Sequence, residues 1–281
     1  MQDPLIIGAI GGSGTRVLQC IAAHAGYFMG THLTRHKDAL PIQQFCRQHA
    51  RRWLVTAGQN PPPAETIQQL EQWFAAAVRE HLAALPNPDG LWGFKVPKSI
   101  HLLPFWDHLY PHMRFIHVLR SGLDIAYSRN WRLEGERQLI LEEAEKKWPP
   151  HRQAIVLWGR VNEAAAEYGA ERLGSRYLCI RFEDLCARPK EVTGQILDFV
   201  GQDRSSLEQA AAEVVAPPSI GRWRQQRLRE IHDMMKAGRS SLERFGYWNP
   251  ANWREIDAAA HAPLWQRWAF RRRRMRDLPA L

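Results

Sequence analysis

A glycine-rich stretch near the start of the chain, Gly11-Gly12-Ser13-Gly14-Thr15-Arg16, holds the first residues that could do chemistry. It lies between an apolar run and a segment with apolar residues at helical spacing, which predicts a strand turning into a helix. Glycines let the backbone approach a ligand closely, N–H groups at a helix N-terminus bind anions, and the two hydroxyls add donors. The stretch therefore predicts a phosphate-binding loop; the alternative is a turn that binds nothing.

This loop departs from two common nucleotide-binding patterns. Val17 stands where the dinucleotide-binding motif needs a small residue. The NTPase loop requires Gly-Lys-Ser/Thr, whereas this chain has Gly14-Thr15-Arg16. The ligand expected from the pattern is thus an anion of another kind.

A second set of polar residues follows the apolar run 114–119. Arg120, Asp124 and Ser128 recur at intervals of four, which places Asp124 and Ser128 on one face of a predicted helix. Ligands of open parallel sheets bind beyond the carboxyl ends of the strands, and the planar guanidinium of Arg120 suits a bidentate grip on a phosphate. A salt bridge beside a surface serine is the alternative.

The elements that must position these residues alternate along the chain. We predict strands at 5–10, 91–96, 114–119 and 176–182, and helices at 64–85, 123–133, 141–168 and 189–200. Alternation of this kind predicts an α/β fold with a central, mostly parallel sheet flanked by helices. We find no repeat or long linker, and so expect one domain spanning 1–281 with a basic C-terminal segment from about residue 222.

Charge is distributed unevenly along the 281 residues. The net charge is +9, and residues 222–281 hold 14 basic and 6 acidic residues, a net of +8. Four cysteines without a CxxC pair favour reduced thiols, and the start of the chain lacks the basic region of a signal peptide. No apolar run approaches the roughly 20 residues that span a bilayer. We expect a cytoplasmic protein.

Taken together, the two motifs resemble the sulfotransferases that use 3′-phosphoadenosine-5′-phosphosulfate. Two further stretches are similar to that family: 177–185 with its Glu-Asp-Leu turn, followed by a helix ending in Phe-x-Gly, and 219–223 with Gly-x-Trp. The resemblance implies a fold like that of the P-loop-containing nucleoside triphosphate hydrolases. It also implies that the glycine loop holds the 5′-phosphosulfate, that Arg120 and Ser128 hold the 3′-phosphate, and that the segment with Arg222 and Trp223 closes over the nucleotide.

The resemblance leaves two catalytic roles open. Many members carry Lys or Arg where this chain has Gly12, so Arg16 or Lys95 would supply the cation that stabilises charge on the leaving group. Lys95 is favoured because 92–98 resembles a family strand that ends in Lys-x-Pro. For the base that takes the acceptor proton, Asp38 and His32 are equal candidates, and the nearby His36 is a third.

We expect no metal ion. His32 and His36, like His108 and His112, have the i, i+4 spacing of a metal half-site, but neither pair has a third ligand in the sequence pattern.

The expected activity is transfer of a sulfuryl group to a hydroxyl, or as second choice an amine, of a small-molecule, lipid or carbohydrate acceptor. Two alternatives stay open: a nucleotide-dependent kinase on a P-loop-like scaffold, and a non-catalytic basic module that binds membranes or nucleic acid. The second draws on 265–274, where tryptophans precede a run from Arg271 to Arg274. With the enzyme interpretation we expect no nucleic-acid partner, and peripheral membrane contact through the basic C-terminal segment is an option.

Overall fold

The computed structural model describes residues 2–57, 63–128, 134–273, 275 and 278. They gather into two compact units, which are described in turn. Unit 1 comprises residues 1–119 and 164–215, and unit 2 comprises residues 120–163 and 216–281. The prediction of one domain over the whole chain stays a prediction.

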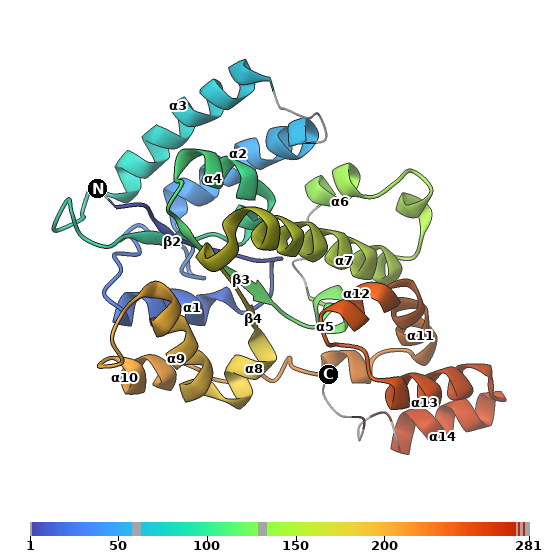
Figure 1. Ribbon diagram of the computed structural model, residues 1–281. Coiled ribbons are helices and arrows are strands. Elements are labelled where there is room, and N and C mark those ends of the chain that lie inside the picture. Colours follow the sequence, from blue (N-terminus) through green and yellow to red (C-terminus); the bar gives the residue numbers. More distant parts are fainter. Residues whose placement is uncertain (1, 58–62, 129–133, 274, 276–277, 279–281) are drawn as a thin grey trace. The chain divides into compact units, whose positions relative to one another are not determined.

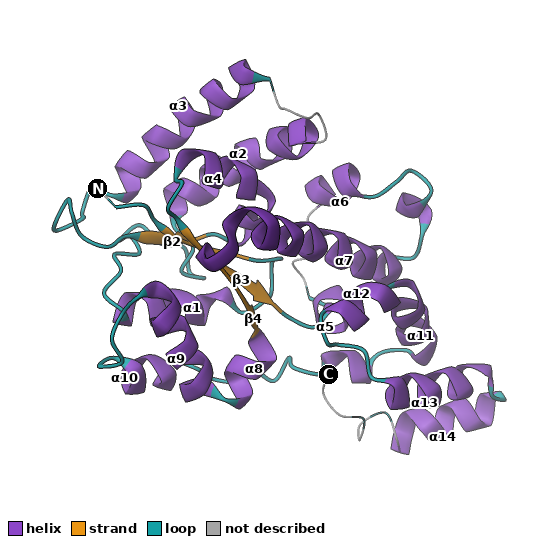
Figure 2. Ribbon diagram, viewed as in Figure 1, coloured by secondary structure: helices purple, strands orange, loops and turns teal. Residues whose placement is uncertain are grey.

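Unit 1 is built on a four-stranded sheet whose strands all run parallel (Figure 2). The strands are β1 (Leu5–Gly8), β2 (Gly93–Lys95), β3 (Arg114–Leu119) and β4 (Tyr177–Arg181), in the order β2-β1-β3-β4. The predicted α/β class with a parallel central sheet is confirmed. Since β1 has β2 on one side and β3 on the other, the chain changes direction across the sheet at β1, where such sheets bind ligands.

Strand β1 is buried along its whole length. Ile6 and Ile7 have no exposed surface, because the sheet is covered on both faces and every β1 side chain meets protein. Gly8 ends the strand where nothing larger fits: a Cβ there would lie 2.5 Å from the Phe115 ring and 2.9 Å from the backbone nitrogen of Ile100. This packing fixes the direction in which the chain leaves the sheet.

Helices cover both faces of the unit 1 sheet (Figure 1). Figure 1 shows α2, α3 and α4 on one face and α1, α9 and α10 on the other. Their bounds, with that of α8, are α1 Thr15–His24, α2 Leu40–Ala57, α3 Ala64–His81, α4 Leu103–Leu109, α8 Phe182–Ala187, α9 Pro189–Val200 and α10 Leu207–Ala212. No described helix is both long and apolar enough to cross a bilayer.

Unit 2 is helical in the residues that the structure describes. Its helices are α5 Gly122–Ala126, α6 Glu134–Ile140, most of α7 Pro150–Tyr168, α11 Leu228–Ala237, α12 Arg239–Arg244, α13 Pro250–His261 and α14 Leu264–Arg273. Trp158 is buried in this unit and packs edge-on against Phe245 and Tyr247, with ring centroids 5.7 and 5.9 Å away.

Several predicted bounds are confirmed, and others are wrong. The strand at 114–119 and the helix at 189–200 are as predicted. The helix expected from residue 141 begins only at Pro150, because consecutive prolines end regular structure before it and Pro150 suits a first helical turn. The helix expected over 123–133 ends at Ala126, and residues 129–133 lie outside the described part. No bounds were predicted for helix α2.

Candidate active site

The glycine-rich loop leaves β1 and leads into α1, as the sequence predicts. Gly12 and Gly14 have φ angles of 99° and 86°, a left-handed conformation that other residues rarely adopt. The carbonyl of Ile10 accepts from Ser13 N at 3.2 Å, so the loop turns back on itself before the helix. Ser13 and Thr15 are buried, at 2% and 6% exposure.

Gly14 is required by its surroundings as well as by its backbone. A Cβ on Gly14 would lie 2.3 Å from the ring of Phe182, the first residue of α8. No side chain caps the N-terminus of α1, and its first turn holds no acidic residue. The helix start therefore carries uncompensated positive character, which suits an anion.

Lys95 lies beside this loop's strand, at the carboxyl end of β2, and is only 1% exposed. Its Nζ donates to Asp38 Oδ1 in an ion pair and to the carbonyl of His36 at 2.7 Å. Burial lowers the pKa of the Lys95 ammonium, the Asp38 carboxylate offsets part of that effect, and the positive charge of Arg16 adds to the lowering. Lys95 and Asp38, predicted separately, are thus one buried pair.

A tight turn brings Asp38 to Lys95. Thr34 N donates to the Asp38 carbonyl at 2.9 Å, and Lys37 takes a left-handed φ of 59° that closes the turn. The backbone of Ala39 donates to the carbonyl of Lys95 at 3.2 Å, which attaches the turn to the end of β2. The second Asp38 oxygen accepts from Gln43 at 2.7 Å, so the carboxylate is held from two sides.

The other predicted residues of unit 1 divide into two groups. Arg16 lies 2.9 Å from a ring nitrogen of His36, so Arg16, His36, Lys95 and Asp38 form one connected cluster. Partial burial and the charges of Arg35 and Arg16 lower the pKa of His36, which favours the neutral ring. His32 is instead 65% exposed and 3.8 Å from Glu80.

In unit 2, Arg120 follows the last residue of β3 and is 4% exposed. Its guanidinium donates to the Ser219 hydroxyl at 2.9 Å and lies 3.9 Å from the Asp124 carboxylate. Its carbonyl accepts from the indole of Trp158 at 2.9 Å, which fixes the backbone to the unit 2 core. Ser219 was not among the predicted site residues, although the sequence motif contains it.

Asp124 joins helix α5 to the predicted closing segment. Its two oxygens accept from the backbone N–H groups of Gly221 at 2.8 Å and Trp223 at 3.2 Å. Burial raises the pKa of Asp124, while these two hydrogen bonds oppose the rise. The Trp223 side chain is 1% exposed, so this tryptophan anchors the segment in the core of unit 2.

Two features of unit 2 suit a bound anion. Burial lowers the pKa of Arg222, and repulsion by the positive charge of Arg120 adds to the lowering. Ser128 Oγ is buried and has no hydrogen-bond partner among the described residues. An anion would relieve the repulsion and give the hydroxyl an acceptor.

The comparisons with known proteins agree on one family. The profile of the sulfotransferase family matches residues 4–206. The chain belongs to the sulfotransferase family. No curated protein matches it significantly.

Solved structures show the same fold at low identity. This sulfotransferase aligns over 89% of its length with the sulfotransferase domain of the Synechococcus PCC 7002 olefin synthase, covering 96% of that chain at 19% identity and a TM-score of 0.50. The alignment with the sulfotransferase domain from the curacin biosynthetic pathway covers 89% of this chain and 99% of that one, at 16% identity and a TM-score of 0.51. The alignment with a sulfotransferase from Mycobacterium avium covers 87% of this chain and 77% of that one, at 12% identity and a TM-score of 0.51. The P-loop-like fold implied by the motifs is confirmed.

Because Gly14 lies against Phe182, adding a methyl group at Gly14 should destabilise the fold. Gly14→Ala should lower the free energy of unfolding by about 1 to 2 kcal/mol through its left-handed backbone, and by a further 1 to 3 kcal/mol through the overlap with the ring. Chemical denaturation of the two proteins measures the difference.

Gly26→Ala is the matched control, because Gly26 has a φ of 85° and nothing within 4 Å of its Cβ position. It should show the backbone cost only. Equal losses in the two variants would contradict a role for Phe182 in shaping the loop.

Proposed function

We propose that this sulfotransferase moves a sulfuryl group from 3′-phosphoadenosine-5′-phosphosulfate to a hydroxyl group, or as second choice an amine, of a small-molecule, lipid or carbohydrate acceptor. The observation that carries the proposal is the pair of features that match the family motifs: a left-handed glycine loop at the uncapped start of α1, and a buried serine hydroxyl without a partner among the described residues. We propose a cytoplasmic location, because free thiols are typical of a reducing compartment.

Each end of the donor is assigned to its own residues. The residues for the 5′-phosphosulfate are those of the loop: Gly11, Gly12, Ser13, Gly14, Thr15 and Arg16. Arg120 and Ser128 would bind the 3′-phosphate, and Arg222 would add a second guanidinium. Trp223 would act by holding this segment in place, since its backbone is bonded to Asp124.

The bound donor supplies the sulfuryl group, and the side chains position it and stabilise charge. Lys95 would stabilise the negative charge that develops as the sulfuryl group leaves, with Arg16 as the second cation. Asp38 would take the proton of the acceptor. The geometry supports Asp38 over His32 for this role, because Asp38 contacts Lys95 whereas His32 pairs with Glu80 on the surface. None of these steps requires a metal ion.

Donor binding is the first test. Calorimetry should show that the full chain binds 3′-phosphoadenosine-5′-phosphate and prefers it to ATP. Arg120→Ala should weaken this binding by about 1.5 to 3 kcal/mol, roughly 10- to 150-fold, because a charge-assisted hydrogen bond is lost.

Arg152→Ala is the control, since Arg152 is an arginine of unit 2 that pairs with Asp233 at 3.6 Å instead. Absence of binding to the unaltered protein would overturn the proposal. A preference for ATP would favour the kinase alternative.

Lys95 should affect turnover far more than donor affinity. With radiolabelled donor and a panel of hydroxyl and amine acceptors, Lys95→Met should lower kcat by about 100-fold or more and change the donor Kd less than about threefold. If the cationic form is needed, activity falls as pH rises through the Lys95 pKa, and that decline should begin below the usual range of lysine because burial lowers this pKa.

Lys98→Met, three positions on, is the matched control and should keep its activity. Chemical denaturation of Lys95→Met, and of Lys95→Met/Asp38→Asn, which removes both buried charges, shows whether the unpaired Asp38 carboxylate destabilises the single variant. Equal losses of kcat and affinity would make Lys95 a binding residue.

We also propose that α14 contacts anionic membrane surfaces. Leu264, Trp265 and Trp268 are 78%, 70% and 61% exposed, and the helix carries arginines but no acidic residue. Exposed tryptophans next to arginines are typical of helices that lie in a bilayer interface. The positive charge of residues 222–281 complements an anionic surface.

Vesicle co-sedimentation tests the membrane contact. The full chain should bind vesicles that contain phosphatidylserine, and Trp265→Ser/Trp268→Ser should weaken this by at least about tenfold. Val215→Ser, which changes a 76% exposed valine of unit 1, should have no effect. Unchanged binding by the double variant would remove the proposal.

A further inference from the structure

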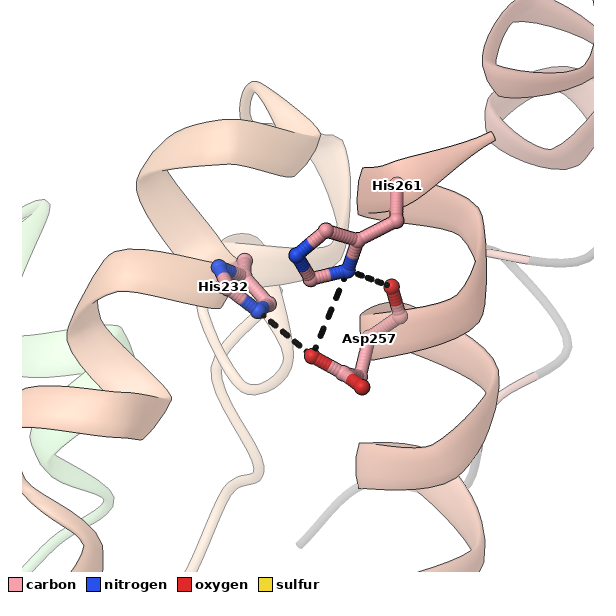
Figure 3. Close-up of side chains that lie close together, drawn as sticks. All are labelled: His232, Asp257 and His261. Atoms are coloured by element: carbon pink, nitrogen blue, oxygen red, sulfur yellow. Dashed lines mark hydrogen bonds and ion pairs between the residues drawn. The ribbon is translucent and has the colours of Figure 1, made fainter. Parts of the chain in front are cut away.

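Three side chains of unit 2 form a compact group of metal-ligating type (Figure 3). His232 of α11 places a ring nitrogen 2.8 Å from a carboxylate oxygen of Asp257 on α13. His261, one turn after Asp257, has a ring nitrogen 3.6 Å from the same oxygen. One donor atom from each residue lies within 4.8 Å of the other two.

The helices hold these residues together for clear reasons. Asp257 and His261 are four residues apart and therefore lie on one face of α13, which starts at a cap where Asn249 accepts two backbone N–H groups. The His232 ring stacks on Trp253, one turn before Asp257, at 5.1 Å between centroids and 15° between planes. Trp253 thus fixes the orientation of the imidazole that crosses from the neighbouring helix.

The three ligand atoms suit a metal ion of intermediate softness. Two imidazoles and one carboxylate suit Zn²⁺, which forms bonds of about 2.0 to 2.2 Å to such ligands. Neighbouring donors around a tetrahedral ion are roughly 3.3 Å apart. The distances of 2.8 Å and 3.6 Å to the carboxylate oxygen lie on either side of that value.

We propose that His232, Asp257 and His261 bind one divalent transition-metal ion of the Zn²⁺ class, with a fourth position open to water. The His261 side chain is 71% exposed, so an ion can reach it from solvent. Binding replaces the contact of its Nδ1 with the Asp257 carbonyl at 2.8 Å. The ion joins α11 to α13 and stabilises this part of unit 2.

Other histidine and acid pairs do not have this composition. His151 and Asp233 are 3.1 Å apart, and His108 and Glu71 are 2.9 Å apart. Within the described ranges, neither belongs to a group of three such ligands. The proposed site also differs from the His32/His36 and His108/His112 half-sites in the sequence, and it does not rest on the sulfuryl-transfer proposal.

The test is titration of the chelator-treated full chain with Co²⁺, followed by visible absorption and equilibrium dialysis, with Zn²⁺ as competitor. The unaltered protein should bind one equivalent that Zn²⁺ displaces. His232→Ala and Asp257→Asn should each weaken binding by at least about tenfold.

His151→Ala is the matched control, because it removes a histidine of the same unit from a His–Asp pair. It should bind as the unaltered protein does. His261→Gln alters an exposed side chain and so tests the site even if the other variants fail to fold. Lack of saturable binding to the unaltered protein, or equal binding by His261→Gln and His151→Ala, would overturn the proposal.

Discussion

The parallel pairing of β1 with both of its neighbours is the constraint on which the candidate active site of unit 1 depends. Ile6 lies opposite Phe94 of β2 and Phe115 of β3, so all three strands end at one edge of the sheet. The glycine loop and Lys95 emerge there together. A slip of one residue between β1 and β2 would move Lys95 by about 3.3 Å and turn it to the opposite face of the sheet.

In both units a carboxylate offsets the free-energy cost of burying a positively charged side chain. Asp38 holds Lys95 and also accepts from Gln43, while Asp124 lies beside Arg120 and accepts from two backbone N–H groups. Each carboxylate therefore compensates a buried positive charge and fixes its position. Cations that are already oriented need little rearrangement when a reacting group arrives, which is the property that charge stabilisation in a transfer reaction requires.

The family match covers some of the functional features of this chain and leaves others outside it. The matched region, 4–206, contains the glycine loop, Lys95, Arg120 and Ser128. The closing segment, the exposed face of α14 and the His232 cluster all lie beyond it. The role of the closing segment rests on the family resemblance. The proposals for α14 and the His232 cluster rest on exposure and contacts within this chain, so their tests are independent of the family assignment.

Local signals in the sequence determined the parallel α/β class, the loop, the strand 114–119 and the helix 189–200. That helix has Pro189 at its start and ends at Gly201 with a φ of 71°, which are preferences of single residues. Only the tertiary structure decided that Lys95 pairs with Asp38, 57 residues away, and that α2 is a helix on the sheet. The His232 cluster also needed it, because its two helices meet through packing across a 25-residue separation. Such contacts depend on which surfaces pack together in the folded chain, and a local pattern of residue types does not predict that packing.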